Sequence, residues 1–117
     1  MLTSLKRTGL FSAGLIMSAV AAHAGMETAE NGMTLYTFDN DSGGVSACYD
    51  DCATNWPPYL GEAGATMDKE GWTLAARTDG TMQWVFDGKP VYFFAGDAAA
   101  GDVNGDGLGG VWHIIGE

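Results

Sequence analysis

Apolar residues alternate with polar or small residues over two stretches in the second half of the chain, residues 72–77 (WTLAAR) and residues 82–86 (MQWVF). A period of two is typical of a β-strand with one buried face. An Asp-Gly pair, which favours a tight turn, follows each stretch. The pattern therefore predicts a three-stranded antiparallel meander over residues 72–94.

The chain also carries one spacing of aromatic and acidic residues twice. Residues 36–41 read YTFDND and residues 92–97 read YFFAGD, so both follow Tyr-x-Phe-x-x-Asp. When residues 26–57 are laid over residues 82–113 without a gap, seven positions are identical, which indicates an internal duplication. The identical pairs are Met26/Met82, Gly32/Gly88, Tyr36/Tyr92, Phe38/Phe94, Asp41/Asp97, Asp50/Asp106 and Trp56/Trp112.

Each copy predicts the same small unit. An Asn-Gly or Asp-Gly turn leads into a strand whose Tyr and Phe, two residues apart, project from one face. We expect these strands over residues 33–38 and 89–94, with Trp56 and Trp112 each packed near the Tyr-x-Phe face of its own copy. The Asp three residues after each Phe falls where the strand should end, and its carboxylate can accept backbone N–H bonds there.

These patterns predict a mainly β fold. We expect small antiparallel sheets, built from a duplicated β-meander unit with pseudo-twofold symmetry and with aromatic side chains between the units. Residues 48–55 (CYDDCATN) have no strand pattern, so we expect one short helical segment near the cysteines. The motif residues with an expected structural role are Tyr36, Phe38, Asp41, Trp56, Tyr92, Phe94, Asp97 and Trp112.

The first 24 residues have the order of a secretory signal peptide: two cationic residues, an apolar run over residues 9–22, and Ala-His-Ala at the end. The alternative is a transmembrane anchor, which needs about 20 strongly apolar residues, more than this run supplies. We therefore expect a signal peptide over residues 1–24 and a single secreted domain over residues 25–117. The predicted location is periplasmic or extracellular, with no membrane insertion after cleavage.

The predicted mature chain is strongly acidic. It keeps all 15 Asp and Glu residues but only Lys69, Arg77 and Lys89, so its net charge is about −12. Such a charge repels phosphate backbones and anionic membranes, which argues against nucleic acid as a partner. The charge is compatible with cationic partners or with metal cations, or it serves only to keep the protein soluble. The many aromatic residues argue for a packed core rather than disorder.

The two motif copies do not stand alone. They occur with CYDDCATNWPP at residues 48–58, RTDGTMQW at residues 77–84 and GDVNGDG at residues 101–107. Together these segments resemble the secreted and lipoprotein repeat family named for its Tyr-x-[Phe/Trp/Tyr]-x-x-Asp motif. The resemblance implies an exported bacterial envelope protein whose molecular function is largely undefined. Many members carry a lipidated cysteine, but this chain has none at the predicted cleavage site, so membrane anchorage is not expected.

Cys48 and Cys52 are the only cysteines. On a helical turn, residues four apart lie about 6 Å apart at Cα, within disulfide range. In an oxidising compartment we expect a disulfide, which should contribute about 2 kcal/mol to stability. The alternative is a redox site or a zinc or copper site. A metal would need further ligands, and the mature chain offers one histidine, His113, and four methionines.

DVNGDG at residues 102–107 resembles half of a calcium loop. Asp102, Asn104 and Asp106 occupy positions 1, 3 and 5, and a glycine occupies position 6. Position 12, normally a bidentate acidic residue, is His113, so any calcium binding should be weak. The alternative is a glycine-rich turn stabilised by Asx side chains. No other cofactor is expected.

The most favoured function is a non-enzymatic binding or accessory module of the cell envelope, with an unidentified envelope or extracellular partner. The first alternative is a metal-binding protein, with calcium ahead of copper or zinc. The second is a carboxylate-based hydrolase in which Asp41 and Asp97 face each other. The sequence favours turn-fixing aspartates over that pair, because the mature chain has a single histidine and no Ser nucleophile in a strand-turn-helix context.

Overall fold

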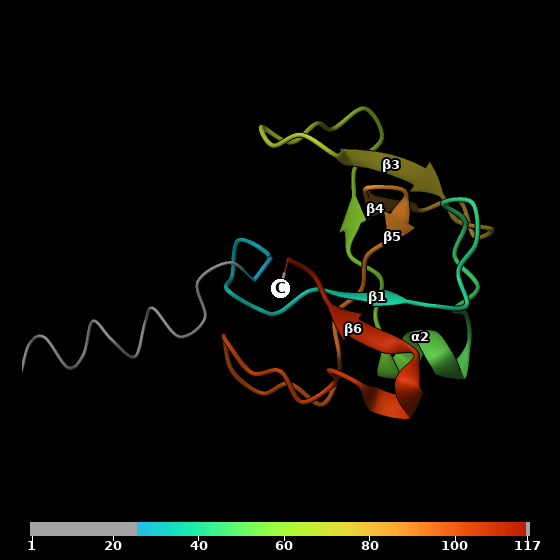
Figure 1. Ribbon diagram of the computed structural model, residues 1–117. Coiled ribbons are helices and arrows are strands. Elements are labelled where there is room, and N and C mark those ends of the chain that lie inside the picture. The colour runs from blue at the N-terminus through green and yellow to red at the C-terminus, as the bar shows by residue number, and fades with distance from the viewer. Residues whose placement is uncertain (1–25, 117) are drawn as a thin grey trace, which may run out of the picture.

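The computed structural model describes residues 26–116, so the signal peptide predicted over residues 1–24 lies outside the described part. The elements are short and mainly β (Figure 1). In chain order they are β1 (Tyr36–Phe38), α2 (Asp51–Asn55), β2 (Leu60–Gly61), β3 (Trp72–Ala76), β4 (Met82–Phe86), β5 (Lys89–Pro90), the 3-10 turn η1 (Leu108–Gly110) and β6 (Trp112–Ile114). The predicted mainly β fold of small antiparallel sheets is confirmed.

The larger sheet is built around β4. Strand β3 pairs with its whole length, while β2 and β5 share its other edge. The strands β3, β4 and β5 are the three-stranded meander expected over residues 72–94. Strand β2 was not expected, since two residues carry no detectable period. At the hairpin between β4 and β5, Asp87 and Gly88 both have positive φ (50° and 81°), as a two-residue turn of this kind requires.

The smaller sheet joins the two ends of the described chain. Strand β1 pairs antiparallel with β6, so that Phe38 lies opposite Trp112. On the other side of β1, Tyr36 and Tyr92 exchange two backbone hydrogen bonds of 2.8 and 2.9 Å. The two motif tyrosines therefore form a hydrogen-bonded antiparallel pair between the smaller and the larger sheet.

Both motif strands are shorter than expected. Strand β1 covers Tyr36–Phe38 rather than residues 33–38, and β5 ends at Pro90, so that Tyr92 makes only isolated bridges, to Tyr36 and to Pro58. Strand β5 is short because the chain leaves β4 after Val91, whose N–H still bonds the Trp84 carbonyl, and Tyr92 then takes partners from β1 and from the segment before β2. The pseudo-twofold relation between the two complete halves remains a prediction.

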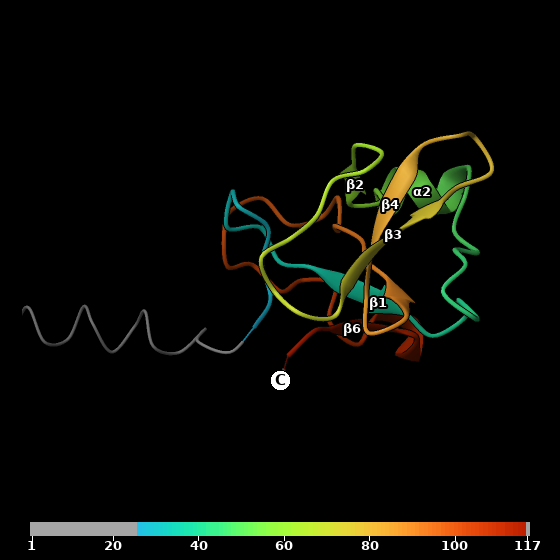
Figure 2. The same cartoon turned by 90° about the horizontal axis from the view of Figure 1, so that it is seen from above.

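Two buried clusters lie on opposite sides of this junction. One contains Tyr36 and Tyr92, and the other contains Leu35 and Val91, because neighbouring residues of an extended chain point to opposite faces. Figure 2 shows from above that the loop between β2 and β3 arches away from the sheets before it returns at Trp72. Among residues 26–116, no helix has the length and apolar character needed to cross a membrane.

The first cluster holds a stack of four aromatic rings. Phe38 stacks on Trp112 with ring centroids 4.1 Å apart, Trp112 stacks on Trp56 at 3.7 Å, and Trp56 stacks on Phe94 at 4.3 Å. Each Trp also makes a T-shaped contact with the Tyr of its own copy, as expected. The Phe stacked on it, however, comes from the other copy. For Trp112 the β1–β6 register explains this difference, since it places Phe38 directly across from Trp112.

Candidate functional site

The two Tyr-x-Phe-x-x-Asp copies exchange hydrogen bonds. The hydroxyl of Tyr36 donates to Asp97 Oδ2, and that of Tyr92 donates to Asp41 Oδ2, both at 2.7 Å. The second oxygen of each Asp accepts a backbone N–H from the loop that follows it, at 2.7 Å for Asp41 and 2.9 Å for Asp97. Each aspartate thus ties its own exit loop to the tyrosine of the other copy. Each carboxylate is thus occupied by one tyrosine hydroxyl and one backbone N–H.

The hydroxyl groups of Tyr36 and Tyr92 are held in their neutral form. Burial, and then the hydrogen bond to Asp97, raise the pKa of Tyr36 well above its ordinary value. Burial also raises the pKa of Tyr92, and the bond to Asp41 adds to that rise. Burial raises the pKa of Asp41, although the Tyr92 hydrogen bond opposes the shift. Both tyrosines therefore remain hydrogen-bond donors at neutral pH.

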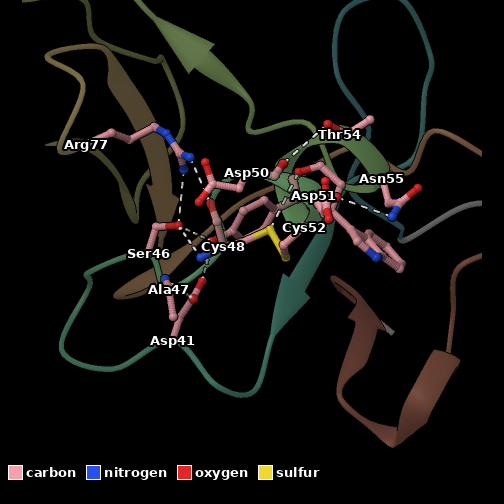
Figure 3. The surroundings of a disulfide bond; sticks show 12 residues. Asp41, Ser46, Ala47, Cys48, Asp50, Asp51, Cys52, Thr54, Asn55 and Arg77 are labelled. Carbon is pink, nitrogen blue, oxygen red and sulfur yellow. Dashed lines mark hydrogen bonds between the residues drawn. A yellow bond between two sulfur atoms is a disulfide. The ribbon is translucent and has the colours of Figure 1, made fainter.

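Cys48 and Cys52 form the expected disulfide, with Cα atoms 5.2 Å apart (Figure 3). The bond spans the start of α2, a single helical turn of five residues in the expected place. Because both sulfurs are in the disulfide, these cysteines offer no thiolate to zinc or copper while the bond is intact. A redox or metal role for the pair stays a prediction.

A buried arginine, which sequence reasoning missed, fixes the cysteine loop. Arg77 is 6% exposed and donates to the carbonyl oxygen of Cys48 (2.8 Å), to Gln83 Oε1 (2.8 Å) and to Ser46 Oγ (3.1 Å). Its guanidinium also lies 4.2 Å from the centre of the Tyr49 ring. The first and third of these donations come from neighbouring guanidinium nitrogens and are drawn in Figure 3. The only hint in the sequence was a charged residue at the end of an alternating strand.

Ser46 extends this network to the motif. Its hydroxyl lies 2.6 Å from that of Tyr92, which in turn donates to Asp41. A continuous chain of hydrogen bonds therefore runs from Arg77 to Asp41. Within residues 26–116, the side-chain carboxylates found within salt-bridge distance of a basic group are Glu27, beside Lys69, and Asp39, beside the His113 ring. The charge of Arg77 is therefore stabilised by neutral acceptors and by the Tyr49 ring.

The residues of the predicted calcium loop bind different parts of the backbone. Asp102 Oδ2 accepts N–H bonds from the residues four and three positions before it (2.9 and 3.0 Å), and Asp106 accepts the N–H of Ile114 (3.2 Å). The Asn104 amide donates to a carbonyl eight residues earlier. No group of three His, Cys, Asp or Glu side chains that could hold a metal ion occurs among residues 26–116. Calcium binding here remains a prediction.

One glycine of this loop has a packing role. A Cβ at Gly105 would meet the Trp56 ring at 2.6 Å and the Phe94 ring at 3.0 Å. The Gly105 N–H also donates to the Tyr36 hydroxyl at 3.2 Å. The loop therefore covers the aromatic stack closely, and this packing accounts for glycine at that position without any metal.

A separate pocket of about 650 Å³ lies beside the larger sheet. Its walls come from residues 27–30, 59–60 and 66–69, and its aromatic side chains are Tyr59, Trp72 and Trp84. The sequence did not predict this pocket. In the sequence, Trp72 and Trp84 have the pattern of core residues of two strands. The other walls come from segments that only the tertiary fold brings together.

The three rings of the pocket lie close to one another. The ring centroids of Tyr59, Trp72 and Trp84 are 6.2 to 6.4 Å apart, and Trp72 is nearly perpendicular to both of the others. Trp72 and Trp84 are diagonal neighbours on one face of the β3–β4 pair, which explains their proximity. The indole N–H of Trp72 is buried and has no hydrogen-bond partner. Buried polar groups of this kind are rare in native structures.

Three carboxylates, Glu27, Glu30 and Asp68, and one ammonium group, that of Lys69, line the same pocket. Lys69 Nζ lies 3.3 Å from Glu27 Oε1, while 67% of the Lys69 side chain remains exposed. Burial, and then the charge of Glu30, raise the pKa of Tyr59. The pocket thus combines aromatic rings with an excess of negative charge.

Comparison with known proteins identifies a protein family but no individual curated protein or solved structure. Residues 19–59 and residues 73–115 both match a protein family described as a secreted repeat of unknown function. Each matched segment contains one Tyr-x-Phe-x-x-Asp copy together with its Trp. No match was found among curated proteins. None was found among solved structures.

Proposed function

Because the chain belongs to the family of secreted repeats of unknown function, we propose that it is an exported, non-enzymatic binding module that holds a small ligand in the pocket beside the larger sheet. The signal peptide predicted over residues 1–24 and the secreted character of the family support a periplasmic or extracellular place of action.

The observation that carries the proposal is the pocket itself. Its volume of about 650 Å³ lies within the range of small-molecule sites, roughly 300 to 1,000 Å³. Aromatic side chains beside a few polar groups are the usual lining of such sites. The partly exposed rings of Tyr59 and Trp72 offer flat apolar surface, and the carboxylates around them supply directional contacts.

The other polar clusters support a binding module rather than an enzyme. Asp41 and Asp97 are each engaged with a tyrosine and with backbone N–H groups. Ser46 is shared between Arg77 and Tyr92. These groups are occupied in holding loops together, whereas the carboxylates of Glu30 and Asp68 belong to exposed residues that line the pocket.

A fragment screen by protein NMR on residues 25–117 tests the proposal. We expect ligands that shift the indole N–H signals of Trp72 and Trp84 and the amide signals of residues 66–69. Thr66 is exposed and lines the pocket, so Thr66→Trp should fill it and abolish binding. Thr73→Trp places the same side chain on β3 outside the pocket and should leave binding intact. Binding that survives Thr66→Trp would rule out this site.

A further inference from the structure

We infer that the ligand of this pocket is an organic ammonium ion, bound with its alkyl part on the aromatic rings and its charge beside the carboxylates. The inference rests on the proposed binding function and narrows it to one class of ligand. Its support comes from the charge of the pocket, from the arrangement of the rings, and from a lysine that already occupies one carboxylate.

The charge of the pocket selects the sign of the ligand. Glu27, Glu30 and Asp68 face one cationic side chain, Lys69, so the lining carries two negative charges in excess. The whole mature chain is acidic as well, with 15 acidic and three basic residues. A site lined by one sign of charge concentrates ligands of the opposite sign and repels ligands of the same sign. Carboxylate and phosphate ligands are therefore disfavoured.

The rings select an organic cation over a metal ion. A cation is attracted to the face of a Trp or Tyr ring when it lies within about 6 Å of the ring centre. Trp84 is only 6% exposed and packs against the other two rings, whereas Tyr59 and Trp72 remain partly exposed, so these two are the rings over which a cation can lie. Calcium and magnesium require a shell of oxygen ligands instead. The alkyl groups of an ammonium ion also bury apolar surface against the rings.

Lys69, which lines the pocket, already places an ammonium group beside one of the pocket carboxylates. Its Nζ lies 3.3 Å from Glu27, but the side chain is 67% exposed and belongs to the loop between β2 and β3. An ion pair this exposed contributes little to stability, so a ligand can displace it. Lys69 is then a built-in competitor for the site. Removing its charge should strengthen the binding of a cationic ligand, an effect that a purely structural lysine would not have.

Calorimetric titration with choline provides the test. Its control is the neutral carbon isostere, in which a tert-butyl group replaces the trimethylammonium group. We expect choline to bind at least about tenfold more tightly than the isostere, because both share one shape and only one is attracted to the rings and carboxylates. Butylammonium tests a primary amine, and glucose tests a neutral ligand that stacks on aromatic rings without charge.

Variants test whether choline binds in the pocket. Lys69→Met should tighten choline binding, and Glu30→Gln should weaken it, since Glu30 is an exposed residue that lines the pocket. Glu62→Gln makes the same change on an exposed residue of the loop between β2 and β3, outside the pocket, and should have little effect. Thr66→Trp should abolish binding. Higher salt concentration should weaken the binding of choline more than that of its isostere.

The outcomes separate this inference from the proposed function. If the isostere or glucose binds as tightly as choline, and Thr66→Trp abolishes that binding, the pocket is a ligand site but the ligand is not a cation. If choline binds and Thr66→Trp leaves its affinity unchanged, the cation site lies elsewhere. If neither ammonium probe binds while screen hits still bind in the pocket, only the cation inference fails. If no probe or screen hit binds, both fail.

Discussion

Arg77 shows how a single buried side chain can organise a loop that has no secondary-structure pattern. Its guanidinium contacts the Cys48 carbonyl, Gln83 and Ser46, and through Ser46 it reaches the motif residue Tyr92. A buried charge is costly unless hydrogen bonds compensate for its desolvation. Here the compensation comes from Gln83 on β4 and from the loop that carries the disulfide, so the arginine and that loop depend on each other.

Arg77→Met should therefore destabilise the fold by at least about 2 kcal/mol, because it leaves buried acceptors without their donor. The midpoint of urea unfolding measures the change. Lys89→Met, which removes an exposed cation from β5, is the matched control and should change stability little. Equal stability of the two variants would show that the Arg77 contacts contribute nothing.

The tyrosines of the motif predict a particular response to alkaline pH. The pKa values of Tyr36 and Tyr92 are raised in the folded protein, while an exposed tyrosine in the unfolded chain titrates near 10.0. The folded state then holds its protons more tightly, so stability is fully present below pH 10 and falls as pH rises through the folded values. We expect the melting temperature to drop above about pH 10.

Tyr36→Phe is the variant to compare. It removes one of the two groups, so its melting temperature should fall less steeply with pH above that point, even though the variant is less stable at neutral pH. Phenolate absorbance measured along the same titration should show both tyrosines ionising only as the protein unfolds. Their ionisation in the folded protein near pH 10 would contradict the burial and hydrogen bonds described here.

The secondary-structure elements that could be predicted best from the sequence are those with the clearest alternation of apolar and polar residues. Strands β3 and β4 alternate clearly and were predicted nearly to the residue, and so was the Asp-Gly hairpin after β4. The second motif strand was overestimated, because after Val91 the backbone takes its partners from β1 and from residues 57–58, which no local pattern encodes. The pocket was missed for the same reason, since its walls are distant in sequence.

The disulfide should stabilise the helical turn beside it. Helix α2 has five residues, too few to persist alone in water, and the bond joins its second residue to the loop before it. We expect reduction to lower stability by about 2 kcal/mol, as measured by unfolding with and without a reductant. The Cys48→Ala, Cys52→Ala double variant should show the lowered stability and no response to the reductant. Unchanged stability in both experiments would count against this role.

The loop over residues 102–107 gives a second prediction at this scale. Calcium would have to compete with the backbone N–H groups that Asp102 and Asp106 already bind, so we expect a dissociation constant no tighter than about 10⁻⁴ to 10⁻³ M. Calorimetry on the wild type and on an Asp102→Ala, Asp106→Ala double variant measures it. Equal heats from both proteins would leave the loop as a cover for the aromatic stack.

In the whole molecule, the two motif copies complete each other. Tyr36 requires Asp97, Tyr92 requires Asp41, and each Trp is stacked on the Phe of the other copy. Neither half of the chain contains all the partners of its own buried groups. Folding should therefore be cooperative across both halves, although the secondary-structure elements of each half are local.

Cutting the chain in the exposed loop after Gly64 tests this interdependence. Residues 25–64 and 65–117 should each lack the near-ultraviolet circular dichroism of ordered aromatic rings when alone. Mixing them should restore the signal at equal proportions, because the stack forms only when both are present. A Phe38→Ala change in the first fragment should weaken the association. An ordered spectrum from one fragment alone would contradict the prediction.

The exchange of partners between the copies also bears on how such a chain could have arisen. A chain with a single copy would have found the aspartate for its tyrosine only on a second, identical chain, through the same surface on both. Its functional form would have been a homodimer, and duplication in tandem would have turned that dimer into one polypeptide. Once joined, the halves could diverge, which is consistent with Ser46 serving Tyr92 while the backbone of Gly105 serves Tyr36. It also allows the molecule to carry a single feature, such as the pocket beside Trp72, that symmetry would otherwise have imposed twice.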